Sequence, residues 1–355
     1  MKKVRLYVFG YRDQSFWCEY GPIVRDLMMV TALCDLEVVE SVTFYNRPVS
    51  LLELLLLRKK ISYPPVGSNK IKFISKISKD IFGPLKKRLW VKGAYKDNYQ
   101  QSPDFSSEYI NVVLDFLPIG DLPNWVSDAD LYWYDLIDNF TKHNRFLEEE
   151  KELVKAKYYT ISSLVGGIKT GVCNKAIKGI YGAKALPNAI LPASSIVAPN
   201  YEFDFGFMGF VTDKFDVDIV IELSRLGYKI AIFGEIYDKT IKKELLAIEK
   251  IYVHGGFTSS ESSEILSKFK VGLIPYINER LHDESPLKLY QYLSVSKPVL
   301  SSYDFEFSHD MFYVYDYTTF SMKAGQALAS ANRGDKVKEK DKADFYWSKR
   351  VSSIV

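Results

Sequence analysis

The chain has 355 residues, of which 47% are hydrophobic and 26% are charged, and its formal net charge is +3. This length exceeds the usual size of one compact core, so we expect two domains of about 150 to 180 residues each. The composition excludes an intrinsically disordered chain. The small net charge argues against a nucleic-acid-binding protein, which would carry a far more basic domain.

Three cysteines, Cys18, Cys34 and Cys173, are too few and too scattered for a disulfide framework or a zinc site. They indicate a reducing compartment, so we expect a cytoplasmic protein. The N-terminal residues MKKVRLYVFG enter a strand-like run without the core of a signal peptide. The longest apolar run, residues 51–57, is far shorter than the ~20 residues that cross a bilayer.

The first half begins with VRLYVFG, an apolar run that ends at Gly10 and predicts a buried parallel strand. Arg12 and Glu19 follow at the strand's carboxyl end, where open α/β sheets bind ligands. Further strands are expected at residues 38–45, 109–114 and 130–136. Because helical stretches alternate with them, the pattern predicts a parallel sheet.

Residues 58–96 form a basic segment with twelve lysines and arginines and one acid, Asp80. Apolar residues are interspersed among the lysines, so the segment is compatible with helices. We expect this surface to contact an anionic membrane, to which each basic side chain contributes about 1 kcal/mol. The alternative is a pair of solvated helices with an ordinary core face.

Acidic residues bracket the predicted strand at 130–136. Asp128 and Asp130 spell Asp-x-Asp, but they lie at the entrance of the strand, opposite the ligand edge, so we expect no metal site there. Asp138 lies at the carboxyl end, where a carboxylate can act as a general base. Asp135 and His143 are alternative bases, and capping of the next helix is the structural alternative for Asp138.

After residue 185 the sequence becomes rich in proline and turn residues. We expect a connector between domains around residues 192–199 and draw the boundary between residues 192 and 193. A second series of strands is expected at residues 205–210, 229–233, 251–254, 271–274 and 299–301. Helical stretches separate most of these strands. This half therefore predicts a second doubly wound domain.

Residues 283–300, DESPLKLYQYLSVSKPVL, are the most informative segment of the chain. Ser285 and Pro286 predict an N-cap and the first turn of a helix whose exposed amides attract anions. Lys288 and Gln291 share one face of this helix, where an ammonium can meet a phosphate and an amide can bind sugar hydroxyls. The alternative is an ordinary amphipathic helix with an incidental lysine.

This segment resembles the SPLKLYEYLAAGKPVV segment of the GT-B glycosyltransferases of bacterial polysaccharide assembly. Many of those enzymes carry glutamate where this chain has Gln291, and another where it has Asp283. The Lys288-x-x-Gln291 form is similar to that of the xanthan glucuronosyltransferase. Residues 134–140, YDLIDNF, resemble the YDxxDDF signature of many polysaccharide transferases.

The resemblance implies the α/β GT-B fold, in which two Rossmann-like doubly wound domains face a cleft. Residues 1–192 would form the acceptor-binding domain and residues 193–340 the nucleotide-sugar-binding domain. Residues 341–355 would form a terminal helix that packs back on the first domain. GT-B enzymes generally stabilise the leaving diphosphate with a helix and basic residues, so we expect neither a metal nor a cofactor beyond the donor.

The resemblance also implies roles for particular residues. Asp138 and Lys288 are the expected catalytic residues. The expected acceptor-side residues are Gly10, Arg12, Glu19, Asp135 and His143. The expected donor-binding residues are Gly209, Gly255, Phe257, Tyr276, Asn278, Ser285, Pro286, Leu287, Lys288 and Gln291.

The function implied is transfer of a sugar from a nucleotide-diphosphate donor, with UDP as the expected carrier. The acceptor would be a saccharide or lipid-linked glycan of a bacterial surface polysaccharide such as a capsule, O-antigen or exopolysaccharide. We expect the protein on the inner face of the cytoplasmic membrane, attached peripherally through residues 58–96. The alternatives are a GT-B nucleotide-sugar epimerase and a non-catalytic protein that binds sugar nucleotides or glycans.

Overall fold

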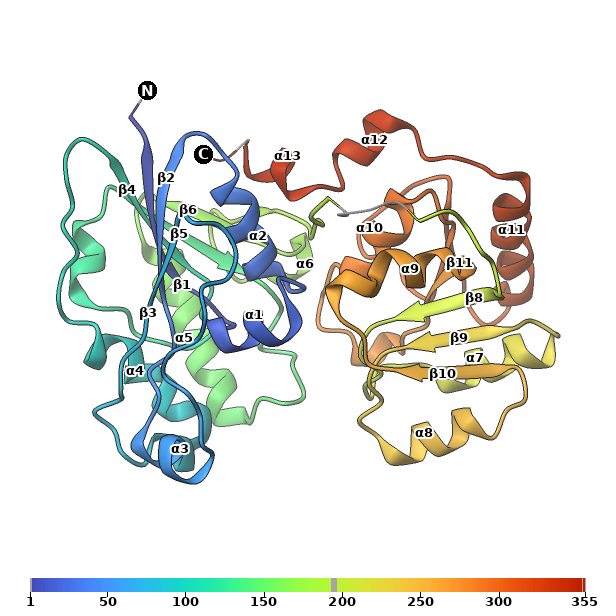
Figure 1. Cartoon of the computed structure of the whole chain (residues 1–355), viewed down its shortest axis with the longest axis horizontal. Helices are drawn as coiled ribbons and strands as arrows, with labels where there is room; N and C mark the ends of the chain where they lie inside the picture. Colours follow the sequence, from blue (N-terminus) through green and yellow to red (C-terminus); the bar gives the residue numbers. More distant parts are fainter. Residues whose placement is uncertain (1, 193–196, 353, 355) are drawn as a thin grey trace. The chain divides into compact units, whose positions relative to one another are not determined.

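A computed structural model of the chain describes residues 2–192, 197–352 and 354. The chain divides into two compact units, and each contains one parallel sheet flanked by helices (Figure 1). Unit 1 runs to Pro187 and also includes the end of the chain from Arg350, whereas unit 2 spans Asn188–Lys349. The connector predicted around residues 192–199 includes residues 193–196, which lie outside the described residues.

The described part of unit 1 contains a seven-stranded sheet in the order β3-β2-β1-β4-β5-β6-β7. The strands are β1 (Val4–Phe9), β2 (Val39–Tyr45), β3 (Ile71–Ile74), β4 (Ile110–Asp115), β5 (Leu131–Leu136), β6 (Ile168–Gly171) and β7 (Lys184–Ala185). The helices are α1 (Gln14–Tyr20), α2 (Arg25–Cys34), α3 (Leu51–Leu56), η1 (Gly83–Trp90), α4 (Val91–Asn98), η2 (Asn124–Asp128), α5 (Glu148–Ser163) and α6 (Asn174–Ile177). α13 (Trp347–Val351) begins in unit 2 and ends in unit 1.

The described part of unit 2 contains a six-stranded sheet in the order β10-β9-β8-β11-β12-β13. The strands are β8 (Phe203–Met208), β9 (Ile230–Phe233), β10 (Ile251–Gly255), β11 (Phe269–Ile274), β12 (Val299–Ser301) and β13 (Phe312–Val314). The helices are α7 (Val217–Arg225), α8 (Lys239–Leu246), η3 (Ser259–Glu261), α9 (Ser262–Ser267), η4 (Asn278–Arg280), α10 (Leu287–Ser294), α11 (Phe320–Arg333) and α12 (Glu339–Ala343).

Both sheets form because continuous apolar strands are covered by helices on their two faces. Phe205, Ile232 and Leu273, from three neighbouring strands of unit 2, are almost completely buried. The side chains of Phe9 and Trp133 are equally buried in unit 1. A strand that is buried on both faces carries apolar residues without alternation, and this confirms the prediction of two doubly wound parallel sheets.

The chain order of the strands reverses direction once in each sheet. In unit 1 the reversal lies between β1 and β4, and in unit 2 it lies between β8 and β11. At such a switch point the loops that follow the two strands diverge to opposite faces and leave a crevice at the carboxyl edge. The physical expectation is one ligand-binding position in each unit, after β1 and β4 and after β8 and β11.

Only part of the basic segment at residues 58–96, which the sequence leaves compatible with helices, is helical. Residues 58–70 contain no helix, β3 follows, and only η1 and α4 are helical. Ile71 and Phe73 alternate with polar residues, so this part pairs with β2 as an edge strand. Within the described residues, no helix combines the length and apolarity needed to cross a bilayer.

Candidate functional site

The carboxyl edge of the unit 2 sheet is built from glycines that let neighbouring loops approach closely. Gly209 follows β8 and Gly234 follows β9, and both have positive φ angles, of 127° and 147°. A Cβ atom on Gly234 would collide with the carbonyl oxygen of Gly209, so glycine is required there. The amide of Gly234 donates to the carbonyl oxygen of Gly255 at 2.6 Å, which joins the end of β10 to the same edge.

Lys288 lies against this glycine edge, at the switch point between β8 and β11. Its Nζ atom would be only 3.2 Å from a Cβ atom placed on Gly209. The ammonium donates to the hydroxyl of Tyr276 at 2.6 Å and lies 3.8 Å from the centre of the Phe207 ring. The lysine predicted to reach a phosphate is therefore held beside the loop that follows β8.

The environment of Lys288 leaves its charge poorly compensated. Burial, together with the nearby Lys214 ammonium, lowers the pKa of Lys288 well below its usual value, although the Glu284 carboxylate opposes the shift. Glu284 is itself paired with Lys214 at 2.6 Å. Lys288 makes no salt bridge with an acid in the described part of the chain, so a bound anion would stabilise its charged form.

Helix α10 begins one residue later than the sequence predicts. Its N-cap is Pro286, and in the part of the chain that the structure describes no side chain caps its first amides. The hydroxyl of Ser285, the predicted N-cap, is instead 2.8 Å from the hydroxyl of Tyr290 and accepts from the amide of Asn188. The N-cap prediction was wrong because the Ser285 hydroxyl bonds Tyr290 and Asn188 instead. The amide of Leu289 donates to the carbonyl oxygen of Pro286, whereas the amides of Leu287 and Lys288 have no such bond within the described residues and can donate to an anion.

The other predicted donor residues differ in their burial and contacts. Gln291 is half-buried one turn after Lys288, and its side-chain amide makes no hydrogen bond within the described residues. Leu287 is half-buried and Asn278 is exposed in η4. Phe257 packs against the core of unit 2, so its ring has a structural role in this structure.

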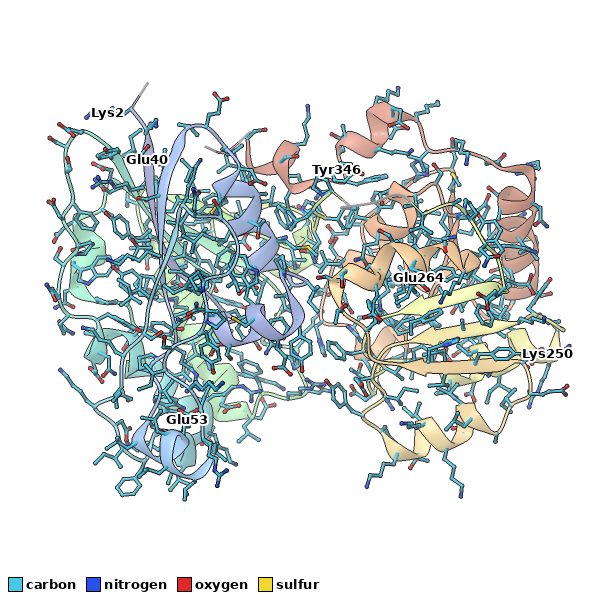
Figure 2. The ribbon with its side chains drawn as sticks, viewed as in Figure 1. Lys2, Glu40, Glu53, Lys250, Glu264 and Tyr346 are labelled. Carbon is cyan, nitrogen blue, oxygen red and sulfur yellow. The ribbon has the colours of Figure 1, made fainter. Side chains whose placement is uncertain are left out.

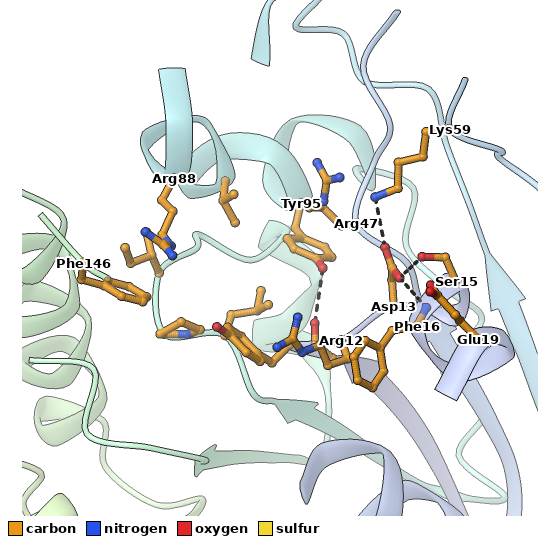
Figure 3. Close-up of a pocket in the computed structure, with 16 residues that line it drawn as sticks. Arg12, Asp13, Ser15, Phe16, Glu19, Arg47, Lys59, Arg88, Tyr95 and Phe146 are labelled. Atoms are coloured by element: carbon orange, nitrogen blue, oxygen red, sulfur yellow. Dashed lines mark hydrogen bonds and ion pairs between the residues drawn. The ribbon is translucent and has the colours of Figure 1, made fainter. Parts of the chain in front are cut away.

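A cavity of about 340 Å³ lies at the carboxyl edge of the unit 1 sheet (Figure 3). Gly10, Arg12 and Glu19 line it, as do residues 117–119, which follow β4. The cavity therefore occupies the β1 and β4 switch point. The structure brings together the three residues that the sequence places in the first loop. Further lining residues are Tyr11, Asp13, Ser15, Phe16, Arg47, Lys59, Arg88, Val91, Tyr95 and Phe146.

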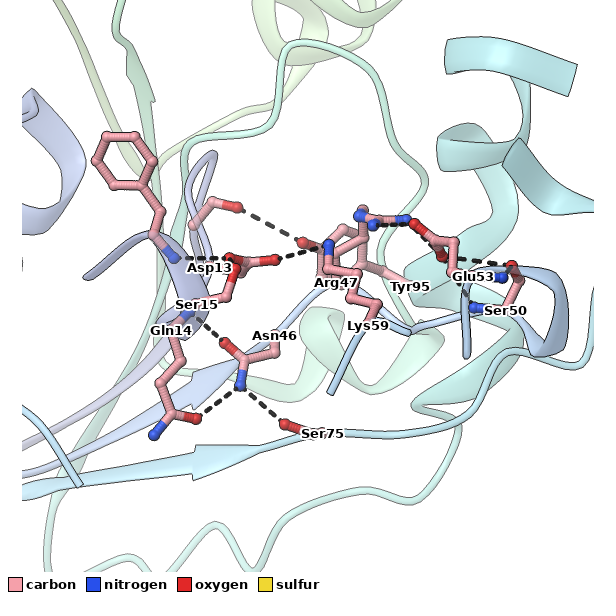
Figure 4. A network of polar contacts seen from close by, with 12 residues as sticks. Asp13, Gln14, Ser15, Asn46, Arg47, Ser50, Glu53, Lys59, Ser75 and Tyr95 are labelled. Carbon is pink, nitrogen blue, oxygen red and sulfur yellow. Dashed lines mark hydrogen bonds and ion pairs between the residues drawn. The ribbon is translucent and has the colours of Figure 1, made fainter. Parts of the chain in front are cut away.

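Ion pairs hold most of the cations around this cavity. Arg47 contacts Glu53 at 2.6 Å, and Lys59 contacts Asp13 at 3.5 Å (Figure 4). Arg88 contacts Glu150 at 3.1 Å. Figure 4 also shows hydrogen bonds that connect the start of α1 with Asn46 and Ser75. The network fixes the shape of the cavity and neutralises most of its charge.

Arg12 differs from the other cations of the cavity. Its guanidinium is exposed and lies 4.8 Å from the Phe16 ring centre and 5.1 Å from that of Tyr11. No salt bridge to an acid joins it within the described chain. Its backbone amide donates to the buried carboxylate of Asp26 at 2.8 Å, which anchors the loop.

Asp138 and His143 lie on the segment between β5 and α5. The Asp138 carboxylate accepts from the amide of Asn139 at 2.8 Å, and the carboxylate is half-buried. The next helix, α5, begins at Glu148, so Asp138 does not cap it. His143 accepts from the amide of Arg145 and stacks on Phe140. Neither residue lines the unit 1 cavity.

Asp135 cannot contact an acceptor in this structure. The residue is fully buried in β5, and its two carboxylate oxygens accept from Arg25 at 2.7 and 2.8 Å. Thr170 also donates to it at 2.6 Å. We therefore correct the predicted acceptor-side role of Asp135, since its hydrogen bonds join α2 to β5 and β6.

Several charged residues at these two sites were not predicted from the sequence. Lys214 and Glu284 flank Tyr276 in unit 2, and the Lys214 ammonium lies 4.7 Å from the Tyr276 ring centre. Arg47 and Arg88 line the unit 1 cavity. The sequence could have indicated Glu284, because this residue directly precedes the predicted helix start at Ser285 and Pro286. No sequence pattern indicates Arg47 and Arg88, because their positions depend on tertiary packing.

Comparison with known proteins identifies the architecture. No protein-family model matches the chain, and no curated protein sequence matches it. Among solved structures, AviGT4, a glycosyltransferase involved in avilamycin A biosynthesis, has a TM-score of 0.59 at 13% identity, covering 100% of this chain and 96% of that one. Sucrose-phosphate synthase from Thermosynechococcus elongatus has a TM-score of 0.64 at 10% identity, covering 99% and 97%.

The chain has the GT-B fold. At identities this low the similarity concerns the backbone architecture alone. Because both alignments extend over nearly the whole of each chain, the similarity includes both units. Within this GT-B architecture, Lys288 and the cavity at Arg12 occupy the switch-point edges of the two sheets.

Proposed function

We propose that this GT-B protein is a glycosyltransferase that moves a sugar from a UDP-sugar donor to a saccharide or lipid-linked acceptor. The proposed setting is assembly of a bacterial surface polysaccharide, with the protein peripheral on the inner face of the cytoplasmic membrane. Lys288 carries the proposal. Its desolvated ammonium, held at the switch point of unit 2 without a salt bridge to an acid, fits an anionic leaving group.

The proposed reaction breaks the bond between the anomeric carbon of the donor sugar and the diphosphate. Negative charge then develops on the diphosphate oxygens. In this proposal, Lys288 and the first amides of α10 stabilise that charge, and their position beside Gly209 and the lack of a side-chain cap support it. Because these groups are preorganised, they need not rearrange as the charge forms.

The acceptor hydroxyl attacks the same carbon and loses its proton. Asp138 is the proposed base, since its carboxylate is only half-buried and does not cap a helix. The unit 1 cavity, which Asp138 does not line, is proposed to hold a part of the acceptor other than the hydroxyl that reacts. Aromatic side chains and paired charges line it, and such a surface suits a ligand that is rich in hydroxyl groups.

Two measurements test the proposal. UDP and UDP-sugars should raise the melting temperature of the full chain, because a ligand that binds only the folded state stabilises it. Incubation with a UDP-sugar and candidate saccharides should release UDP and form a glycoside detectable by mass spectrometry. Stabilisation without transfer or hydrolysis would indicate a binding protein, and conversion of the UDP-sugar to an isomer would indicate an epimerase.

A further inference from the structure

A ridge of exposed apolar side chains protrudes from unit 1. In and just after α3, Leu55, Leu56 and Leu57 are 76%, 71% and 70% exposed. In and near η1, Phe82 and Leu85 are 58% and 70% exposed. We call these five residues the leucine ridge. Figure 2 shows side chains standing off the ribbon of α3 near Glu53.

The two halves of the leucine ridge belong to one surface. The amide of Leu52 in α3 donates to the carbonyl oxygen of Ile81, just before η1, at 3.4 Å. Leu51, Ile77, Ile81 and Leu89 are also exposed beside them. Large apolar side chains gathered on one exposed surface indicate a docking site, because soluble proteins rarely expose such a patch without a partner.

The surroundings of the leucine ridge are cationic. Residues 51–60 and 77–92 contain two carboxylates, and both are ion-paired: Glu53 with Arg47 and Asp80 with Lys86. The exposed cations without a salt-bridge partner in the described chain are Arg58, Lys60, Lys79, Lys87 and Lys92. Two copies of this surface would repel each other, whereas an anionic surface with an apolar interior complements it.

We infer that the leucine ridge inserts into an anionic lipid bilayer while the surrounding lysines contact its headgroups. An amphipathic surface of this kind binds through buried apolar area together with electrostatic attraction. The inserted residues belong only in part to the basic segment, which contains Phe82 and Leu85 of the leucine ridge. Ile71 and Phe73 belong to β3, and Leu55, Leu56 and Leu57 precede the basic segment.

Docking in this way would present the unit 1 cavity to the bilayer surface. Lys59, two residues after Leu57, lines the cavity, and so does Arg88 of η1, which carries Leu85. If sugar transfer is the function, an acceptor with a membrane anchor reaches the cavity directly. This consequence rests on the proposed function, but docking itself does not.

Flotation of the full chain with lipid vesicles tests the inference. The wild-type protein should float with vesicles of equal parts phosphatidylcholine and phosphatidylglycerol, bind phosphatidylcholine vesicles weakly, and be partly released by salt. The triple variant L55S/L56S/L85S should bind the mixed vesicles at least about tenfold more weakly. The variant K60Q/K79Q/K87Q should bind more weakly and lose part of its salt dependence.

The matched control is V165S/L246S, whose side chains are also exposed but lie outside the ridge. This variant should bind vesicles as the wild type does. Stabilisation by UDP, measured on every variant, reports folding and donor binding separately from docking. Equal binding to both kinds of vesicle, or unchanged binding of the leucine variant, would overturn the inference. A dimer that the leucine variant dissociates, without vesicle binding by the wild type, would also overturn it.

Discussion

The carboxyl edges of the two sheets differ in whether their cationic side chains form salt bridges. At the edge in unit 1, Arg47 and Lys59 each meet a carboxylate, and most cations there are neutralised within the protein. At the edge in unit 2, Lys288 makes its hydrogen bond to the neutral hydroxyl of Tyr276. Gly209 borders Lys288, and Lys288 forms no salt bridge within the described residues.

This difference indicates which kind of ligand suits each edge. A desolvated ammonium without a salt bridge gains stability when an anion binds, so the edge in unit 2 favours a diphosphate. In unit 1 the charges of Arg47, Lys59 and Arg88 are already paired, and only Arg12 lacks a salt bridge to an acid within the described residues, so this edge gains less from a bound anion. Its fixed donors and acceptors and its aromatic rings suit hydroxyl groups, so the edge in unit 1 favours a sugar.

The largest effect is expected at Asp138, because loss of the base removes a proton acceptor from the reaction. Asp138→Asn should lower kcat by about 10²- to 10⁴-fold and leave stabilisation by UDP unchanged. Initial rates of UDP release with donor and acceptor give kcat. Asp128→Asn is the matched control, since this exposed aspartate lies at the opposite end of β5. Retained turnover in Asp138→Asn would move the base role to His143.

The next largest effect is expected at Lys288. Lys288→Ala should lower kcat by about 10²- to 10³-fold, because the developing diphosphate charge loses its nearest cation. The dissociation constant for UDP should also rise. Lys242→Ala changes an exposed lysine of α8 and should leave both quantities unaltered. Unchanged kcat and unchanged UDP affinity in Lys288→Ala would contradict the assignment of the diphosphate to the edge in unit 2.

The position of this lysine was predictable because local sequence determines it. The helix that begins after Pro286 places Lys288 one turn before Gln291. This helix follows β11 in the chain, so it begins on the carboxyl side of that strand. The strands were predictable for a similar reason, since continuous apolar runs specify buried parallel strands. Local sequence patterns therefore predicted the fold and the position of Lys288 at the carboxyl edge of the unit 2 sheet.

Contacts between distant residues were not predictable in this way. Asp135 forms a buried ion pair with Arg25, which is 110 positions away in the sequence. Because of this partner, Asp135 does not have the ligand contact that the sequence predicts. Ser285 meets Asn188 from 97 positions away, which moves the start of α10. Most leucines of the apolar run at residues 51–57 are exposed, which nothing in the run itself indicates.

A smaller effect concerns stability, at a carboxylate of unit 1 that is not fully paired. Burial raises the pKa of Asp26 to about 6, although the Arg12 amide opposes the shift. The Oδ1 atom of Asp26 has no hydrogen-bond partner among the described residues. Because the folded pKa exceeds the unfolded value of about 3.9, folding is favoured by this group at low pH. The free energy of unfolding should therefore decrease between about pH 4 and pH 6, by at most about 3 kcal/mol.

Denaturant unfolding of the wild type and of Asp26→Asn across this pH range measures the contribution. The variant should lose most of the decrease, because asparagine does not titrate, and should equal or exceed the wild type in stability at pH 7. Asp121→Asn, at an exposed position, should retain the decrease. An identical pH dependence in the wild type and Asp26→Asn would show that this carboxylate is ionised throughout.

The central claim is that Lys288 holds a diphosphate, and calorimetric titration of UDP into the protein tests it most directly. Because the pKa of free Lys288 is depressed and an anion would raise it, binding should take up a proton and weaken as the pH rises. Titrations in two buffers with different ionisation enthalpies measure that proton. We expect proton uptake in the wild type and its loss in Lys288→Ala. Absence of UDP binding, or identical titrations for both proteins, would contradict the account.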